Sequence, residues 1–126
     1  MEWKLELVPI PVSDVDRAKS FYTDKVGFNL DHDVRATNEM RVVQLTPPGS
    51  ACSIAIGTGI VDTSPGSVRG LHLVVPDVNA ARAELADRGV DVGQVQDLGG
   101  ILYVTFSDPD GNGWALQQMP EGASRS

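Results

Sequence analysis

The chain contains one sequence pattern twice, about half its length apart. Segment 8–18, VPIPVSDVDRA, recurs at 71–81 as LHLVVPDVNAA, so that Asp14 aligns with Asp77 and Ala18 with Ala81. Each copy then runs through a helix-like stretch to a glycine followed by a hydrophobic residue, at 27–28 and at 89–90. An internal repeat of this length predicts two copies of one supersecondary unit packed together. The seam between two such units is a frequent place for a small-molecule site.

Length and composition are those of one ordinary globular domain. The chain has 126 residues, of which 41% are hydrophobic and 21% charged, and its formal net charge is −7. This negative charge argues against a nucleic-acid partner, because the phosphates would be repelled, and it weakly favours a cationic ligand. No apolar run approaches the roughly 20 residues of a membrane span, so we expect no membrane partner.

The start of the chain and its single cysteine predict the compartment. The first residues, MEWKLE, are charged and show no hydrophobic secretory segment. Cys52 has no second cysteine in the chain with which to form a disulfide, which fits a reducing environment. We therefore expect a cytoplasmic protein.

Hydrophobic periodicity predicts the order strand, helix and three strands in each half. In the first half, the helix is capped by Ser13 or Asp14 and ended by Gly27; in the second, it is capped by Asp77 and ended by Gly89. The segment 108–113, DPDGNG, predicts a tight turn. The predicted helices are 15–26 and 78–88, and the predicted strands are about 7–12, 29–35, 40–46, 51–56, 71–75, 93–96, 101–107 and 113–118.

These elements define one domain over residues 1–120 made of two βαβββ modules. The repeats cover 5–56 and 68–119. Segment 57–67 is rich in Gly, Ser and Thr and is the predicted linker, and 121–126 is predicted to be a disordered tail.

Three features together resemble the vicinal oxygen chelate superfamily, which includes glyoxalase I, extradiol dioxygenases and the bleomycin- and fosfomycin-resistance proteins. They are the paired D-hydrophobic-x-x-A helix starts, the pair Phe21-Tyr22, and the turn Asp108-Pro-Asp-Gly-Asn. All three occur within the βαβββ order predicted for each half. The resemblance covers about residues 5–119. It implies an α+β fold in which two βαβββ modules form a cupped mixed sheet with helices on the convex face. It also implies a homodimer, because a second chain often completes the cup in this family.

The metal-dependent members of the superfamily place one ligand on each of four strands. The ligands are typically a His seven residues before the Asp that opens each helix, and a Glu in the last strand of each half. The equivalent positions in this chain are Leu7, Ala55, Gly70 and Ala115. None of these residues has a side-chain lone pair for a divalent cation. We therefore expect no metal and no other cofactor, as in a metal-free branch of the family.

The alternation along each strand, combined with the family's fold, predicts which side chains line the cup. This lining combines apolar side chains with neutral hydrogen-bonding groups, which suits a flat or amphipathic ligand. Tyr103 adds a stacking surface and a hydroxyl. The carboxylates fall at helix starts and turns, and none is expected within a strand on this face. The predicted lining residues are Leu7, Pro9, Met40, Gln44, Ser53, Ala55, His72, Tyr103, Thr105 and Gln117.

The leading hypothesis is a metal-free binding protein, similar to the bleomycin-resistance branch, that sequesters an aromatic or cationic natural product or antibiotic in a dimeric cavity. One alternative is a metal-independent isomerase, lyase or cyclase that transfers a proton through His72 or Tyr103. A second is a metal-dependent glyoxalase-like lyase or dioxygenase, which would need a different strand register. A third is an interaction module with a closed cup. The sequence assigns no catalytic residue and leaves enzymatic activity open.

Overall fold

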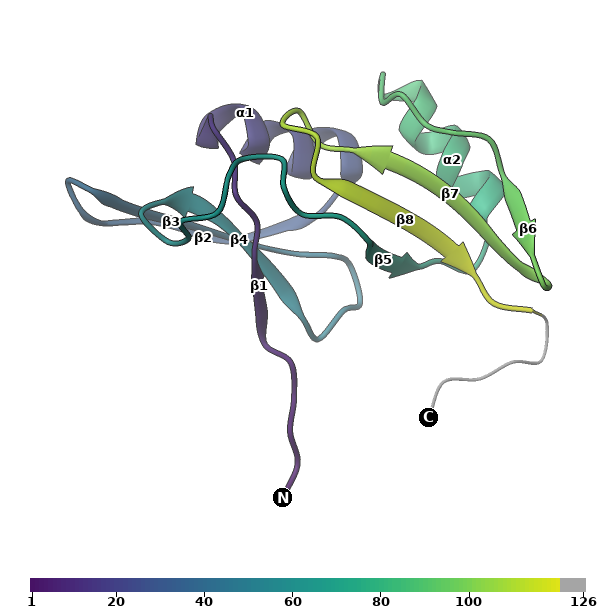
Figure 1. Ribbon diagram of the computed structural model, residues 1–126, viewed down its shortest axis with the longest axis horizontal. Coiled ribbons are helices and arrows are strands. Elements are labelled where there is room, and N and C mark those ends of the chain that lie inside the picture. The colour runs from purple at the N-terminus through teal and green to yellow at the C-terminus, as the bar shows by residue number, and fades with distance from the viewer. Residues whose placement is uncertain (121–126) are drawn as a thin grey trace. The chain divides into compact units, whose positions relative to one another are not determined.

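The computed structural model describes residues 1–120, which form two compact units (Figure 1). The first unit consists of residues 1–68 together with the turn 108–112, and the second of residues 69–107 and, among the described residues, 113–120. Each unit has one four-stranded mixed sheet, in the predicted element order βαβββ. The expected α+β fold with two βαβββ modules is therefore confirmed. The predicted tail at 121–126 lies outside the described residues.

The first sheet has the order β1-β4-β3-β2. Strand β1 runs parallel to β4, whereas β3 runs antiparallel to both β4 and β2. Strand β1 is shorter than the predicted 7–12, because Pro9 and Pro11 each lack the N–H that a longer ladder requires. The strands of the first sheet are β1 (Leu7–Pro9), β2 (Asn29–Thr37), β3 (Met40–Thr46) and β4 (Ser53–Thr58).

The predicted helix of the first unit is present but changes type halfway. It begins as α1 (Val15–Ser20), whose N-cap Asp14 accepts a hydrogen bond from the backbone N–H of Arg17 at 3.0 Å. It continues as the π-helix η1 (Phe21–Val26) and ends at Gly27, whose φ is 91°. The hydroxyl of Thr23 donates to the carbonyl of Lys19 at 2.8 Å, and such back-bonding competes with the regular ladder and distorts helices.

Helix α1 packs against β4, so one face of the first sheet is covered (Figure 1). Ile54 and Ile56 of β4 and Val43 and Leu45 of β3 are all buried, as the strand alternation predicts for side chains that face a helix.

The second sheet has the order β5-β8-β7-β6, with β5 parallel to β8. Helix α2 (Val78–Asp87) is capped by Asp77, which accepts from the backbone N–H of Ala80 at 3.0 Å, and it packs against β7 and β8 (Figure 1). Trp114 and Phe106 stack in this core with ring centroids 6.3 Å apart. The strands are β5 (Leu71–Val74), β6 (Gln96–Leu98), β7 (Ile101–Ser107) and β8 (Gly113–Gln118). None of the helices within residues 1–120 is long and apolar enough to cross a membrane.

The turn between β7 and β8 is held inside the first unit by a buried polar network. Asp108 is 5% exposed, and Tyr22 and Asn112 are fully buried. The hydroxyl of Tyr22 and the side-chain amide of Asn112 both donate to Oδ2 of Asp108, each at 2.8 Å. The same amide donates to the carbonyl of Pro11 at 2.8 Å, and Oδ1 of Asn112 accepts from the backbone N–H of Val68 at 3.1 Å. The network therefore joins the turn to Pro11 just beyond β1, to Tyr22 of η1 and to Val68 just after the predicted linker.

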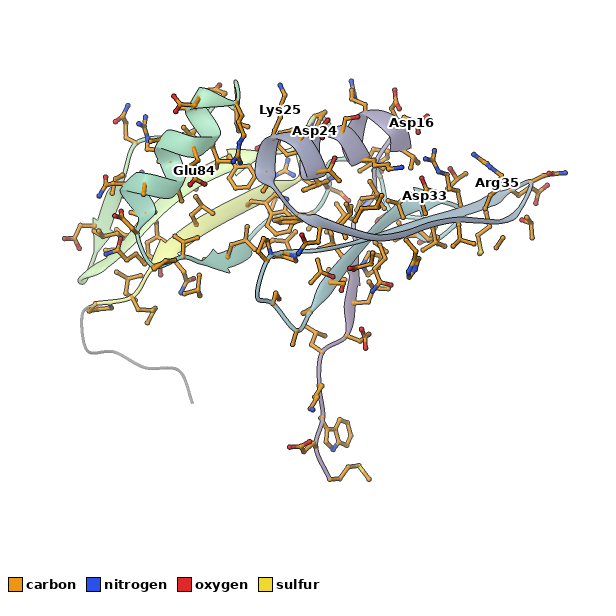
Figure 2. The ribbon with its side chains drawn as sticks, turned by 180° about the vertical axis from the view of Figure 1, so that it is seen from behind. Asp16, Asp24, Lys25, Asp33, Arg35 and Glu84 are labelled. Atoms are coloured by element: carbon orange, nitrogen blue, oxygen red, sulfur yellow. The ribbon has the colours of Figure 1, made fainter. Side chains whose placement is uncertain are left out.

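A second polar cluster joins α1 to the hairpin of β2 and β3. The guanidinium of Arg41 donates two hydrogen bonds to the carboxylate of Asp33, at 3.0 and 2.8 Å. It also forms an ion pair with Asp16 of α1 at 2.9 Å. Lys19 of α1 reaches Asp33 at 2.9 Å. Figure 2 shows Asp16 on the helix and Asp33 on the strand below it. The hydrogen bonds from Arg41 and Lys19 hold the pKa of Asp33 well below its usual range, and Asp33 in turn raises the pKa of Arg41.

We expect Asn112→Ala to destabilise the protein by about 2–4 kcal/mol, because it removes the hydrogen-bond partner of several buried groups at once. Tyr22→Phe removes a single hydroxyl and should cost about 1 kcal/mol. The free energy of unfolding in urea, measured for both variants, tests this. Equal losses, or a loss below about 1 kcal/mol for Asn112→Ala, would contradict the central role of Asn112.

We expect Asp33→Asn to lower stability by about 1–2 kcal/mol at neutral pH, because it breaks a charge-assisted pair that is partly screened by water. The folded-state pKa of Asp33 is depressed below the value of 3.8 for a free side chain. The stabilisation is therefore fully present above that value and is lost as the pH falls below it towards the folded-state pKa. Urea unfolding of the wild type and the variant between pH 7 and pH 3 should show the two curves converging only in acid. The exposed Asp24→Asn is the matched control, and a constant difference down to pH 3 would contradict this expectation.

Candidate functional site

The candidate site residues of the second unit lie on the sheet face opposite α2. Ala115 of β8 lies between His72 of β5 and Thr105 of β7 in the strand register. Two residues along β8, Gln117 pairs with Tyr103 of β7 in the same way. The alternation of β8 places Trp114 and Leu116 in the core on the opposite face, where both are 4% exposed.

Three of these side chains contact one another. Nδ1 of His72 lies 2.7 Å from Oε1 of Gln117. The rings of His72 and Tyr103 meet edge to face, with centroids 5.9 Å apart and planes at 88°. Gln117 also donates from Nε2 to Sδ of Met119 at 3.4 Å. His72 is exposed, and Tyr103 and Gln117 are half-buried, so the cluster combines an accessible polar edge with a fixed aromatic surface.

The candidate residues of the first unit share the face of its sheet that α1 does not cover. Leu7 pairs with Ser53, and Ala55 lies between Pro9 and Gln44 in the register. Gln44 donates from Nε2 to the hydroxyl of Ser53 at 3.3 Å.

Exposure differs sharply among the residues of this face. Leu7 and Met40 are 36% and 38% exposed, whereas Ser53 and Ala55 are only 4% and 2% exposed. Met40 stands at the hairpin end of β3, paired with Thr37. The side chains around Ser53 and Ala55, rather than these two residues, therefore present most of this surface to solvent.

A hydrogen-bonded pair of polar residues on this face, Thr46 and Asp31, was not predicted from the sequence. The hydroxyl of Thr46 lies 2.6 Å from that of Ser53, and Thr46 also donates a hydrogen bond to Asp31 of β2. The alternation of β3 gives Thr46 the same face as Gln44, so it could have been found. Asp31 could not, because it is the extra residue of a β-bulge between Leu30 and His32, which breaks the alternation. The expectation that no strand carboxylate lies on this face is therefore wrong for Asp31.

The four positions that correspond to metal ligands do not fit a cation. Leu7, Ala55 and Ala115 present hydrocarbon side chains, and Gly70, just before β5, presents none. Within residues 1–120, the His, Cys, Asp and Glu side chains form no group of three or more that is suitable for a metal ion. Apart from the carboxylate of Asp31, the polar side chains described on these two sheet faces are neutral groups suited to hydrogen bonding and stacking.

Comparison with known proteins agrees with this fold. Residues 4–116 match the family model of the Glyoxalase/Bleomycin resistance protein/Dioxygenase superfamily. The structure is similar to that of TnmS3, an antibiotic binding protein from Streptomyces sp. CB03234, with 37% identity, a TM-score of 0.86, and coverage of 94% of this chain and 97% of that one.

Two other relatives extend the comparison. A glyoxalase/bleomycin resistance protein from the same Streptomyces strain is 38% identical, with a TM-score of 0.82 and coverage of 91% of this chain and 100% of that one. The Bacillus subtilis protein YetH is 25% identical over 113 residues, which are 88% of this chain and 94% of YetH. The match to the family model extends over most of the chain and agrees with the fold. This chain therefore belongs to the glyoxalase/bleomycin resistance protein/dioxygenase superfamily.

Proposed function

We propose that this protein binds a small aromatic natural product or antibiotic on the uncovered faces of its sheets, as a homodimer and without a metal. The observation that carries the proposal is the cluster of His72, Tyr103 and Gln117. It offers an aromatic surface and hydrogen-bonding groups on adjacent strands, which is the combination that fixes a small ligand. The similarity to TnmS3, an antibiotic binding protein, supports the same ligand class.

The side chains at the four family ligand positions support binding rather than metal-assisted catalysis. Removal of one ligand from a metal site weakens it, but here all four positions lack a donor atom. Their small or apolar side chains leave apolar surface where a metal-dependent relative would hold its cation. Such surface favours the ring of an organic ligand.

The first unit supports a dimer. Beyond the edge strand β1, the apolar residues Met1, Trp3 and Leu5 alternate with charged ones, and they are 107%, 88% and 70% exposed. This period-2 pattern is that of a strand with one apolar face. Exposed apolar side chains next to an unpaired strand edge are typical of an interface, and we propose that a second copy of the chain covers them.

A metal-independent enzyme is the second candidate, because an exposed histidine beside a tyrosine has the groups for proton transfer. The hydrogen-bond partner of His72 makes catalysis by proton transfer the less favoured candidate. In hydrolytic triads, a carboxylate stabilises the imidazolium that forms during proton transfer. Here the partner is the neutral amide of Gln117.

We expect native mass spectrometry, with and without added Zn²⁺ and Ni²⁺, to show a dimer that takes up no stoichiometric metal. The physical reason is the absence of donor atoms at Leu7, Ala55, Gly70 and Ala115. One tightly held metal ion per chain would contradict the metal-free proposal, and a monomer at micromolar concentration would contradict the dimer.

We expect Tyr103→Ala to weaken the binding of a flat aromatic probe, 2-naphthol, by roughly 1–3 kcal/mol, because the aromatic anchor of the site is lost. Tyr103→Phe keeps the ring and should retain most of the affinity. Isothermal titration calorimetry measures both. An unchanged affinity in Tyr103→Ala would remove Tyr103 from the site, and steady conversion of the probe would favour the enzyme.

A further inference from the structure

The two ring nitrogens of His72 have different surroundings. Nδ1 lies 2.7 Å from Oε1 of Gln117, and an amide oxygen accepts hydrogen bonds but does not donate them. The contact therefore requires the ring hydrogen on Nδ1. In a neutral imidazole with its hydrogen on Nδ1, the other nitrogen, Nε2, is an acceptor.

The orientation of the Gln117 amide is supported at its other end. Its Nε2 donates to Sδ of Met119 at 3.4 Å. If the amide were reversed, its oxygen would face the sulfur, which has no hydrogen to donate, and this hydrogen bond would be lost. The pairing of β8 with both β5 and β7 fixes the backbone from which Gln117 projects. The hydrogen-bonded chain Met119–Gln117–His72 thus selects one tautomer.

The free nitrogen belongs to an accessible ring beside the proposed aromatic anchor. His72 is exposed, and no hydrogen bond to its Nε2 occurs within the described chain. The ring of Tyr103 stands at 88° to the imidazole with centroids 5.9 Å apart. An aromatic ligand that packs on Tyr103 therefore brings its own substituents close to the imidazole.

We propose that Nε2 of His72 determines specificity on this face by accepting a hydrogen bond from a hydroxyl or N–H group of the aromatic ligand. This inference rests on the proposed binding function and narrows its ligand class to aromatic compounds that carry such a donor, such as phenols. Gln117 is the positioning residue, because its amide oxygen holds the hydrogen of His72 on Nδ1. Compounds with the same ring but an ether in place of the hydroxyl bind less well.

The tautomer is tested first, in the ligand-free protein at about pH 8, by long-range ¹H–¹⁵N NMR spectroscopy of the histidine side chains. The chain has two histidines, so His72→Ala assigns the signals. We expect a protonated Nδ1 and an unprotonated Nε2 in His72, and a loss of this preference in Gln117→Leu. The opposite tautomer in the wild type would overturn the inference, whatever the protein binds.

Selectivity is tested by calorimetry with 2-naphthol and its methyl ether, 2-methoxynaphthalene. We expect the wild type to bind the naphthol about two- to tenfold more tightly, the range for one hydrogen bond between neutral groups. This preference should disappear in His72→Ala and persist in His32→Ala, which removes the other histidine.

The outcomes separate the two proposals. Equal affinity of the wild type for both probes would overturn the role of His72 and leave the binding function standing. Failure of both probes to bind would overturn the binding function for aromatic ligands, and the inference with it. A preference that persists in His72→Ala would assign the acceptor to another group and overturn the inference alone.

Discussion

The first unit depends on a single buried carboxyl group that lies far from it in sequence. Asp108 receives hydrogen bonds from Tyr22 and Asn112, and its other oxygen accepts from the backbone N–H groups of Asp110 and Asn112. A buried polar group is costly unless it is paired, so these contacts must form together. The consequence is that the compact unit of the first repeat incorporates the β7–β8 turn of the second. The two sequence repeats therefore do not coincide with the two compact units of the structure.

Elements with a strong local signal could be predicted closely from the sequence. Strands β3, β7 and β8 have the bounds that their alternation predicts, and Asp14 and Asp77 cap the helices as expected. Two of the elements that differ from the prediction are η1 and β6, and the difference at η1 has a cause outside local periodicity. The π-helix η1 keeps the same buried side chains as an α-helix, so apolar spacing cannot distinguish them. Strand β6 lies at 96–98 rather than 93–96, although the backbone N–H of Gly93 already bonds to Thr105 at 2.9 Å.

The residues of the candidate site also fall into those that strand alternation predicts and those that it misses. Where the strands are regular, parity predicts which residues share a face, and the structure shows contacts between such residues: His72 with Gln117, and Gln44 with Ser53. Parity fails at the bulge in β2, which turns Asp31 towards Thr46. Parity also carries no information on exposure: Ser53 and Ala55 share a face with Leu7, yet they are buried and Leu7 is exposed. Whether these residues contact a ligand stays a prediction.

The chemistry of His72 follows from which residue stands beside it. A carboxylate at position 117 would attract the charge of an imidazolium, whereas the amide oxygen of Gln117 only accepts a hydrogen bond from Nδ1. In the proposed tautomer, Nε2 of His72 has a lone pair that accepts a hydrogen bond from a ligand along a defined direction. Without a metal, as we propose, the scaffold would lack a cation to polarise a substrate but would keep the surfaces that hold one. The donor-free positions and the amide partner of His72 are thus the two observations behind our proposal that this protein binds its ligand without turnover.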